Sequence, residues 1–141
     1  MNLPTNGMRF WIRIDQIEVA SFAECSPIVI ETETEEVREG GRNGVARQLP
    51  KRTRYRNLIF SRGIDEERSL YRWYLKTVEG RPQRLPVSII LYNDRREAIR
   101  QWNLRGAFPV KWTGPNLNAS FNELAVERLE IAFEEMTQDS D

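Results

Sequence analysis

The segment EVREGGRNGVARQLPKRTRYRNLIFSRG, from Glu36 to Gly63, separates the charges of this chain sharply. Between Arg38 and Arg62 it holds eight basic residues against one acidic residue. Immediately upstream, residues 31–36 include four glutamates. The chain as a whole has 21 basic and 21 acidic residues, so its formal net charge is zero. An acidic block beside a basic block in a neutral chain indicates complementary surfaces, which could join one copy to another.

The residues on both sides of this segment alternate between apolar and polar side chains, as half-buried β-strands do. Residues 8–14, MRFWIRI, show the alternation most clearly, and residues 17–25 suggest a returning strand. Residues 28–37 and 55–62 predict two further strands. Between Gly41 and Tyr55 the pattern disappears, so we expect a long loop there. Loops of that length are usually functional or ordered by a partner.

The second half of the chain predicts one helix and three more strands. Residues 66–78 carry apolar side chains at helical spacing, after a suitable N-cap at Asp65 and before a suitable C-terminal glycine, Gly80. A β-hairpin is expected on either side of residues 94–97, with a polar tip. Residues 124–135 alternate like a strand, although their Leu, Ala and Glu content leaves a helix open.

These elements predict a mainly β (α+β) fold. We expect a small antiparallel β-barrel or sandwich of two packed sheets with one flanking helix. Residues 1–141 are expected to form a single domain, with residues 1–7 and 136–141 flexible. No apolar run approaches the ~20 residues that span a membrane, and the N-terminus lacks the layout of a signal peptide.

Composition argues against catalysis and against a bound metal or cofactor. The chain has no histidine and a single cysteine, Cys25, which removes the usual general base and any zinc cluster. The glycines after residue 39 lack the sequence context of a phosphate-binding loop. We interpret four carboxylates that could form acid–base pairs as solvated surface: Asp94, Glu97, Glu123 and Glu127. We therefore expect no catalytic, metal-binding or cofactor-binding residues.

Several motifs in order resemble the tail tube family of contractile phages, which includes the inner tube proteins of extracellular contractile injection systems. The resemblance covers about residues 10–133. It is carried by REGG at residues 38–41, LP at 49–50, NL at 57–58 and RG at 62–63, and by KWTGPNLNA at 111–119. Three departures stand out: a hairpin tip at 94–97 without glycine, Lys51 after Leu-Pro, and Phe133-Glu-Glu near the C-terminus.

The resemblance implies a structural subunit that forms hexameric rings, which stack into a rigid hollow tube. A contracting sheath would drive this tube through a target envelope, with cargo in the lumen. The implied partners are further copies of the chain, a sheath protein and a baseplate or tube-initiating protein, without direct membrane insertion. The subunit would be made and assembled in the bacterial cytoplasm. It would become part of an injection particle or a virion tail. The same family also allows a tube-initiating ring near the baseplate.

The loop after the glutamate-rich strand would then be the inter-subunit loop. We expect its basic residues to pair with carboxylates of a neighbouring copy, and its glycine pair to allow a close approach. The expected interface comprises Glu31, Glu33, Glu35, Arg38, Glu39, Gly40, Gly41, Arg42, Arg47, Arg52, Arg54 and Arg56.

Two other classes of function remain open at this point. The first is a monomeric β-barrel that binds nucleic acid through residues 38–62, with Trp11 and Tyr55 for stacking. The second is an enzyme of the same particle, such as a cell-wall hydrolase, which would need an acid–base pair that the sequence does not offer.

Overall fold

The computed structural model describes residues 8–17, 22, 24–38, 44–64, 66–117 and 125–139. These residues divide into two compact units. The first comprises the described residues up to Ser26 and from Asn57 onward, and the second comprises Pro27–Arg56.

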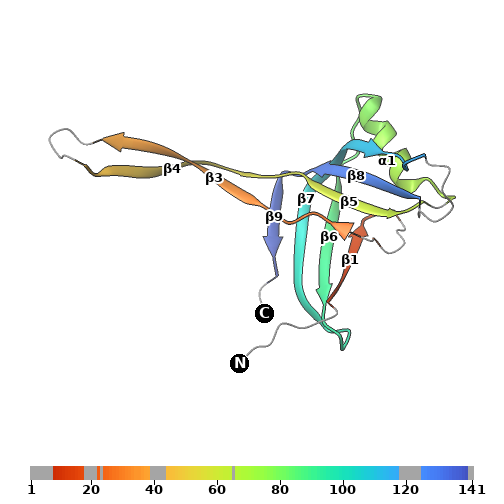
Figure 1. Cartoon of the computed structure of the whole chain (residues 1–141). Coiled ribbons are helices and arrows are strands. Elements are labelled where there is room, and N and C mark those ends of the chain that lie inside the picture. The colour runs from red at the N-terminus through yellow and green to blue at the C-terminus, as the bar shows by residue number, and fades with distance from the viewer. Residues whose placement is uncertain are drawn as a thin grey trace. The chain divides into compact units, whose positions relative to one another are not determined.

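The strands of the large unit form two antiparallel sheets. The first, here named sheet A, has four strands. Its order is β1-β6-β7-β9, and Figure 1 shows these strands side by side, with β1 and β9 at the two edges. The strands are β1 Arg9–Ile14, β6 Leu85–Tyr92, β7 Ala98–Thr113 and β9 Glu135–Gln138.

The second sheet, here named sheet B, shares the long strand β7 with sheet A. After Ala107, β7 pairs with β8, and the order runs β7-β8-β5-β2. The remaining strands are β5 Leu58–Gly63, β8 Val126–Ala132 and the short β2 Glu24–Cys25. The change of partner occurs beside Gly106, whose φ of +70° is a backbone conformation that glycine adopts easily.

The core of this unit lies between the two sheets. Sheet A contributes the buried side chains Ile12, Ile14, Val87, Ile89 and Leu104, while sheet B contributes Leu58, Phe60, Leu129 and Ile131. The alternation that predicted these strands reflects this packing, because every second side chain faces the opposing sheet. The mainly β fold and the sandwich of two packed antiparallel sheets are thus confirmed. Among the described strands, the sheets do not close into a barrel.

The flanking helix α1, Ser69–Val78, is confirmed, although it begins three residues later than the sequence predicted. Arg68 precedes it in a left-handed conformation with φ 55°, and the expected N-cap, Asp65, lies outside the described residues. Trp73 is buried, and its indole N–H donates to the Gln83 carbonyl over 2.7 Å. Within the described residues, no helix is both long and apolar enough to cross a membrane.

The second unit is a two-stranded antiparallel hairpin of β3 Ile30–Arg38 and β4 Ala46–Tyr55. The prediction of a loop between Gly41 and Tyr55 is therefore wrong for residues 46–55, which form β4. Strand β4 escaped detection because its side chains are polar on both faces. Its partner β3, rather than burial, supplies the hydrogen bonds that make it a strand.

The C-terminal end also differs from expectation. Residues 136–141 were expected to be flexible, but residues 135–138 form β9, which pairs with β7 from Arg105↔Glu135 to Trp102↔Gln138. The polar hairpin tip at residues 94–97 is confirmed. There the Asn93 side-chain oxygen accepts the backbone N–H groups of Arg95 and Glu97, both over 2.9 Å.

Candidate functional site

The β3–β4 hairpin exposes both of its faces. Of its nineteen strand residues, only Glu31, Val37, Ala46 and Tyr55 are partly shielded from solvent. An isolated two-stranded hairpin is at best marginally stable in water, because it has no hydrophobic layer to cover it. Both faces of the hairpin are therefore largely open to solvent.

Charges concentrate on one of the two hairpin faces, here named the charged face. Register places Glu31 opposite Arg54, and Glu33 opposite the bulged pair Lys51-Arg52. The charged face comprises Glu31, Glu33 and Glu35 on β3, with Arg47, Lys51, Arg52, Arg54 and Arg56 on or beside β4. The opposite face carries Thr32 and Thr53, whose hydroxyls hydrogen-bond over 2.9 Å.

Glu31 forms ion pairs within its own chain. Its carboxylate accepts a hydrogen bond from Arg56 Nη2 over 2.7 Å and lies 3.6 Å from Arg54 Nε. The hydrogen bond from Arg56 lowers the pKa of Glu31, with a smaller contribution from the charge of Arg54. By contrast, Glu33 and Glu35 have no ion pair with any residue that the structure describes.

The structure thus brings most of the expected interface residues together, but not all on one face. The register sets Arg38 on the face opposite Glu35, where its guanidinium lies 3.8 Å from Glu36. Four expected residues lie outside the described part of the chain: Glu39, Gly40, Gly41 and Arg42.

The two edges of sheet A form a second candidate surface, and the sequence did not identify which strands form them. Among the described strands, β1 pairs only with β6 and β9 pairs only with β7. Both strands therefore present unpaired backbone N–H and C=O groups along one side, which invites pairing with another strand. The alternation of residues 8–14 predicts a strand. It does not predict that this strand lies at an edge, because that depends on the order of the strands in the sheet.

Part of the outer face of sheet A is polar and linked by hydrogen bonds. Asn103 Oδ1 accepts from the Ser88 hydroxyl and from Gln101 Nε2, each over 2.9 Å, while Asn103 Nδ2 donates to Asp139 over 3.0 Å. The network connects β6 and β7 to Asp139, the residue that follows β9. These polar side chains suit contact with water, whereas Trp11 and Ile90 make another part of the same face apolar.

A buried ion pair lies inside the large unit. Arg62 Nε donates to Glu127 Oε1 over 2.8 Å, and the Trp112 indole N–H donates to Glu127 Oε2 over 3.0 Å. The expectation that Glu127 is solvated surface is therefore wrong, whereas Asp94 and Glu97 are exposed. The fourth carboxylate of that expectation, Glu123, lies outside the described residues. Burial also removes Arg62 from the basic stretch that a nucleic-acid-binding protein would need.

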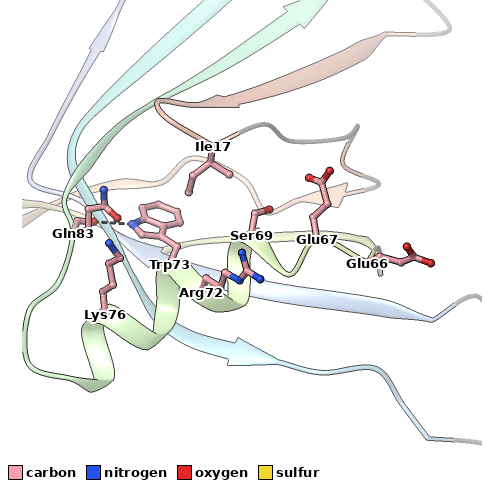
Figure 2. Close-up of a pocket in the computed structure, with 8 residues that line it drawn as sticks. All are labelled: Ile17, Glu66, Glu67, Ser69, Arg72, Trp73, Lys76 and Gln83. Atoms are coloured by element: carbon pink, nitrogen blue, oxygen red, sulfur yellow. Dashed lines mark hydrogen bonds between the residues drawn. The ribbon is translucent and has the colours of Figure 1, made fainter.

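A groove of about 430 Å³ lies beside α1 (Figure 2). In the picture, Glu66 and Glu67 lie at one end and Lys76 and Gln83 at the other, with Arg72 between them. Carboxylates and cations of this kind could hold a polar segment, but these side chains include no activated nucleophile. Across the described residues, no group of three His, Cys, Asp or Glu side chains could hold a metal ion.

Solved structures of contractile injection particles contain chains with the same fold. A chain of the anti-feeding prophage (AFP) baseplate is 24% identical, with a TM-score of 0.85 over 98% of this chain and 97% of that chain. A chain of the PVC sheath–tube complex, an extracellular contractile injection system in its extended state, is 23% identical. Its TM-score is 0.83 over 98% of this chain and 93% of that chain.

A more distant likeness is Hcp1 from Flavobacterium johnsoniae. It is 15% identical, with a TM-score of 0.67 over 92% of this chain and 94% of that chain. A search of curated proteins found no significant match. The family model described as T4-like virus tail tube protein gp19 matches residues 6–137. Because that match spans nearly the whole chain, this protein belongs to the T4-like virus tail tube family and is a structural tube protein.

Proposed function

We propose that six copies of this chain form a ring and that the rings stack into a rigid hollow tube. The observation that carries this proposal is sheet A, a four-stranded sheet with an unpaired edge on each side among the described strands. The similar AFP baseplate structure is 6-fold symmetrised, which supports six copies.

The number and direction of the strands favour a ring. Sheet A has four strands that alternate in direction, so β1 and β9 run antiparallel to each other. A rotation about the ring axis keeps every copy in the same orientation. It therefore sets β9 of one copy antiparallel to β1 of the next, and the sheet continues without a break in alternation. A head-to-tail contact of this kind closes into a ring where the rotation permits it.

The hairpin supplies a second contact, which we assign to a neighbouring copy in the same or the next ring. Two strands exposed on both faces gain a covering layer when another copy packs on them. Glu33, Glu35, Lys51 and Arg52 have no ion pair with any described residue of their own chain, so they remain available to a neighbour. Individual exposed ion pairs contribute little, but a tube repeats each contact many times.

The wider setting follows from the family. A sheath would surround the tube, a baseplate or initiator would template it, and the lumen would carry cargo. The similar PVC chain belongs to a sheath–tube complex, which supports a sheath as partner. The subunit would be made in the cytoplasm as one domain and would act mechanically, without catalysis or membrane insertion of its own.

The first test is negative-stain electron microscopy of the purified chain over a range of concentrations, with light scattering alongside. Six-fold rings or stacked tubes are expected. A strict monomer at every concentration, with and without a baseplate template, would contradict the proposal. A tube-initiating ring is the second candidate, favoured by the likeness to a baseplate chain. Single rings that never stack would identify it.

A further inference from the structure

We infer that opposite charges on the two edges of sheet A direct ring assembly: they favour the β1–β9 contact between copies and oppose β1–β1 and β9–β9 contacts. This inference rests on the proposed function, because it concerns the same edges. Beyond the proposed function, it states which edge of one copy pairs with which edge of the next. It also names the side chains that determine this choice.

The β1 edge is basic on the outer face of the sheet. Arg9, Trp11 and Arg13 alternate with the buried Ile12 and Ile14, so these three side chains share the outer face. All three are exposed, and Trp11 retains 40% of its accessible surface. Among the described residues, neither Arg9 nor Arg13 has a carboxylate partner within its own chain.

The β9 edge is acidic on the same face. Register aligns Arg13, Ser88, Asn103 and Thr137 in one row across the four strands. Glu135 and Asp139 lie two residues on either side of Thr137 and thus point to the same face. Asp139 accepts a hydrogen bond from Asn103 over 3.0 Å and has no ion pair with any described residue. Glu135 is paired with Arg105.

Antiparallel pairing between like edges would bring like charges together. If β1 paired with β1 around Trp11, Arg9 of each copy would face Arg13 of the other. If β9 paired with β9 around Thr137, Glu135 would face Asp139. Like charges directly opposite each other on a sheet are destabilising.

Pairing between unlike edges has the opposite effect. With Trp11 opposite Thr137 of the partner subunit, Arg9 lies opposite the partner's Asp139 and Arg13 opposite the partner's Glu135. A shift of one residue would place the apolar Ile12 and Ile14 on the polar face, so only even shifts keep the faces continuous. Two-fold dimers through one edge are thereby disfavoured, and the head-to-tail contact remains.

Charge reversal tests this inference. The first variant carries Arg9→Glu and Arg13→Glu, so both of its edges are acidic. The second carries Glu135→Lys and Asp139→Lys, so both of its edges are basic. Neither should form rings alone, and the concentration for half-assembly should rise by about tenfold or more. An equimolar mixture should form rings in which the variants alternate, visible by native mass spectrometry as equal numbers of each.

Two control variants distinguish the effect of the edge charges from misfolding and from the change in net charge. Because Glu135→Lys breaks the contact with Arg105, a third variant with Asp139→Lys alone preserves that contact. It reverses one of the two facing charge pairs, so it should weaken assembly in the same direction as the second variant but to a smaller extent. Arg72→Glu with Arg81→Glu makes the same charge change as the first variant, on α1 and just after it, away from both edges, and should leave assembly unchanged. Circular dichroism and thermal unfolding check the fold of every variant.

The outcomes are distinct. Folded edge variants that form rings alone as well as the unaltered chain does would overturn the charge inference, and so would a mixture that stays monomeric. An unaltered chain that forms no rings under any condition would instead overturn the proposed function.

Discussion

The guanidinium of Arg62 and the carboxylate of Glu127 form a hydrogen-bonded ion pair at 2.8 Å, with 1% and 5% of the residue surfaces exposed. The two residues are direct cross-strand partners on β5 and β8. Arg62 Nη2 also donates to the Ser69 hydroxyl over 3.2 Å, at the first residue of α1. The pair thus connects sheet B to the beginning of the helix.

Breaking this pair should destabilise the protein strongly. Glu127→Gln or Arg62→Met leaves the other charge buried without its counterion, and we expect the free energy of unfolding to fall by about 3–5 kcal/mol. Urea denaturation measures the change. The exposed pair Arg84–Glu134, at 3.0 Å, is the matched control, and Glu134→Gln should cost less than about 1 kcal/mol. Equal losses at both sites would contradict the structural role of the buried pair.

Gly106 should tolerate no side chain without a loss of stability. Its φ is +70°, and a Cβ built there would lie 2.7 Å from the Glu134 carboxyl group. We expect Gly106→Ala to lower the free energy of unfolding by about 1–3 kcal/mol, mainly through the left-handed backbone, because the Glu134 side chain can move away. Gly63→Ala is the control, since the nearest atom to its Cβ is the Ala125 carbonyl oxygen at 4.0 Å. Thermal unfolding of both variants decides whether the backbone at residue 106 is strained.

Reversal of three arginines on the charged face should block tube formation. The variant Arg52→Glu, Arg54→Glu, Arg56→Glu replaces attraction to a neighbour's carboxylates with repulsion, and we expect tubes to disappear in electron micrographs. The large unit should stay folded, as judged by near-ultraviolet circular dichroism from its tryptophans.

The same number of reversals on the large unit controls for total charge: Lys76→Glu, Arg81→Glu and Arg95→Glu. Tubes of normal length from the hairpin variant would show that the charged face is not an interface. Loss of tubes from both variants would instead point to net charge as the cause.

Cys25 should react slowly with thiol reagents. Burial raises the pKa of its thiol to about 11, and its Sγ lies 3.3 Å from the Ser26 carbonyl oxygen, to which the thiol donates. Because the thiolate is the reactive form and only a small fraction is deprotonated at pH 8, we expect labelling about a hundredfold slower than for an unperturbed thiol. The rate should rise with pH up to about 11.

The same protein unfolded in guanidinium serves as the reference for Cys25, and a disulfide reagent with a coloured leaving group gives the rate. Labelling of the folded chain at the unfolded rate would show that the thiol is accessible and ordinary.

The sequence by itself determined the fold class and the family. Apolar and polar residues alternate in residues 8–14 because one sheet face is buried, and that signal is local, so it needs no knowledge of partners. The same holds for α1 and for the hairpin tip at residues 94–97. The order of short motifs along residues 10–133 carried the resemblance that the family match to residues 6–137 confirmed.

Tertiary structure decided what local pattern could not show. Strand β4 is polar on both faces and β9 has only four residues, so each is a strand because of the partner that supplies its hydrogen bonds. Glu127 occupies a position that looks like surface in the sequence, yet it is buried and its carboxylate accepts hydrogen bonds from Arg62 and Trp112. The edges of sheet A likewise depend on strand order, which follows from packing between residues far apart in the chain.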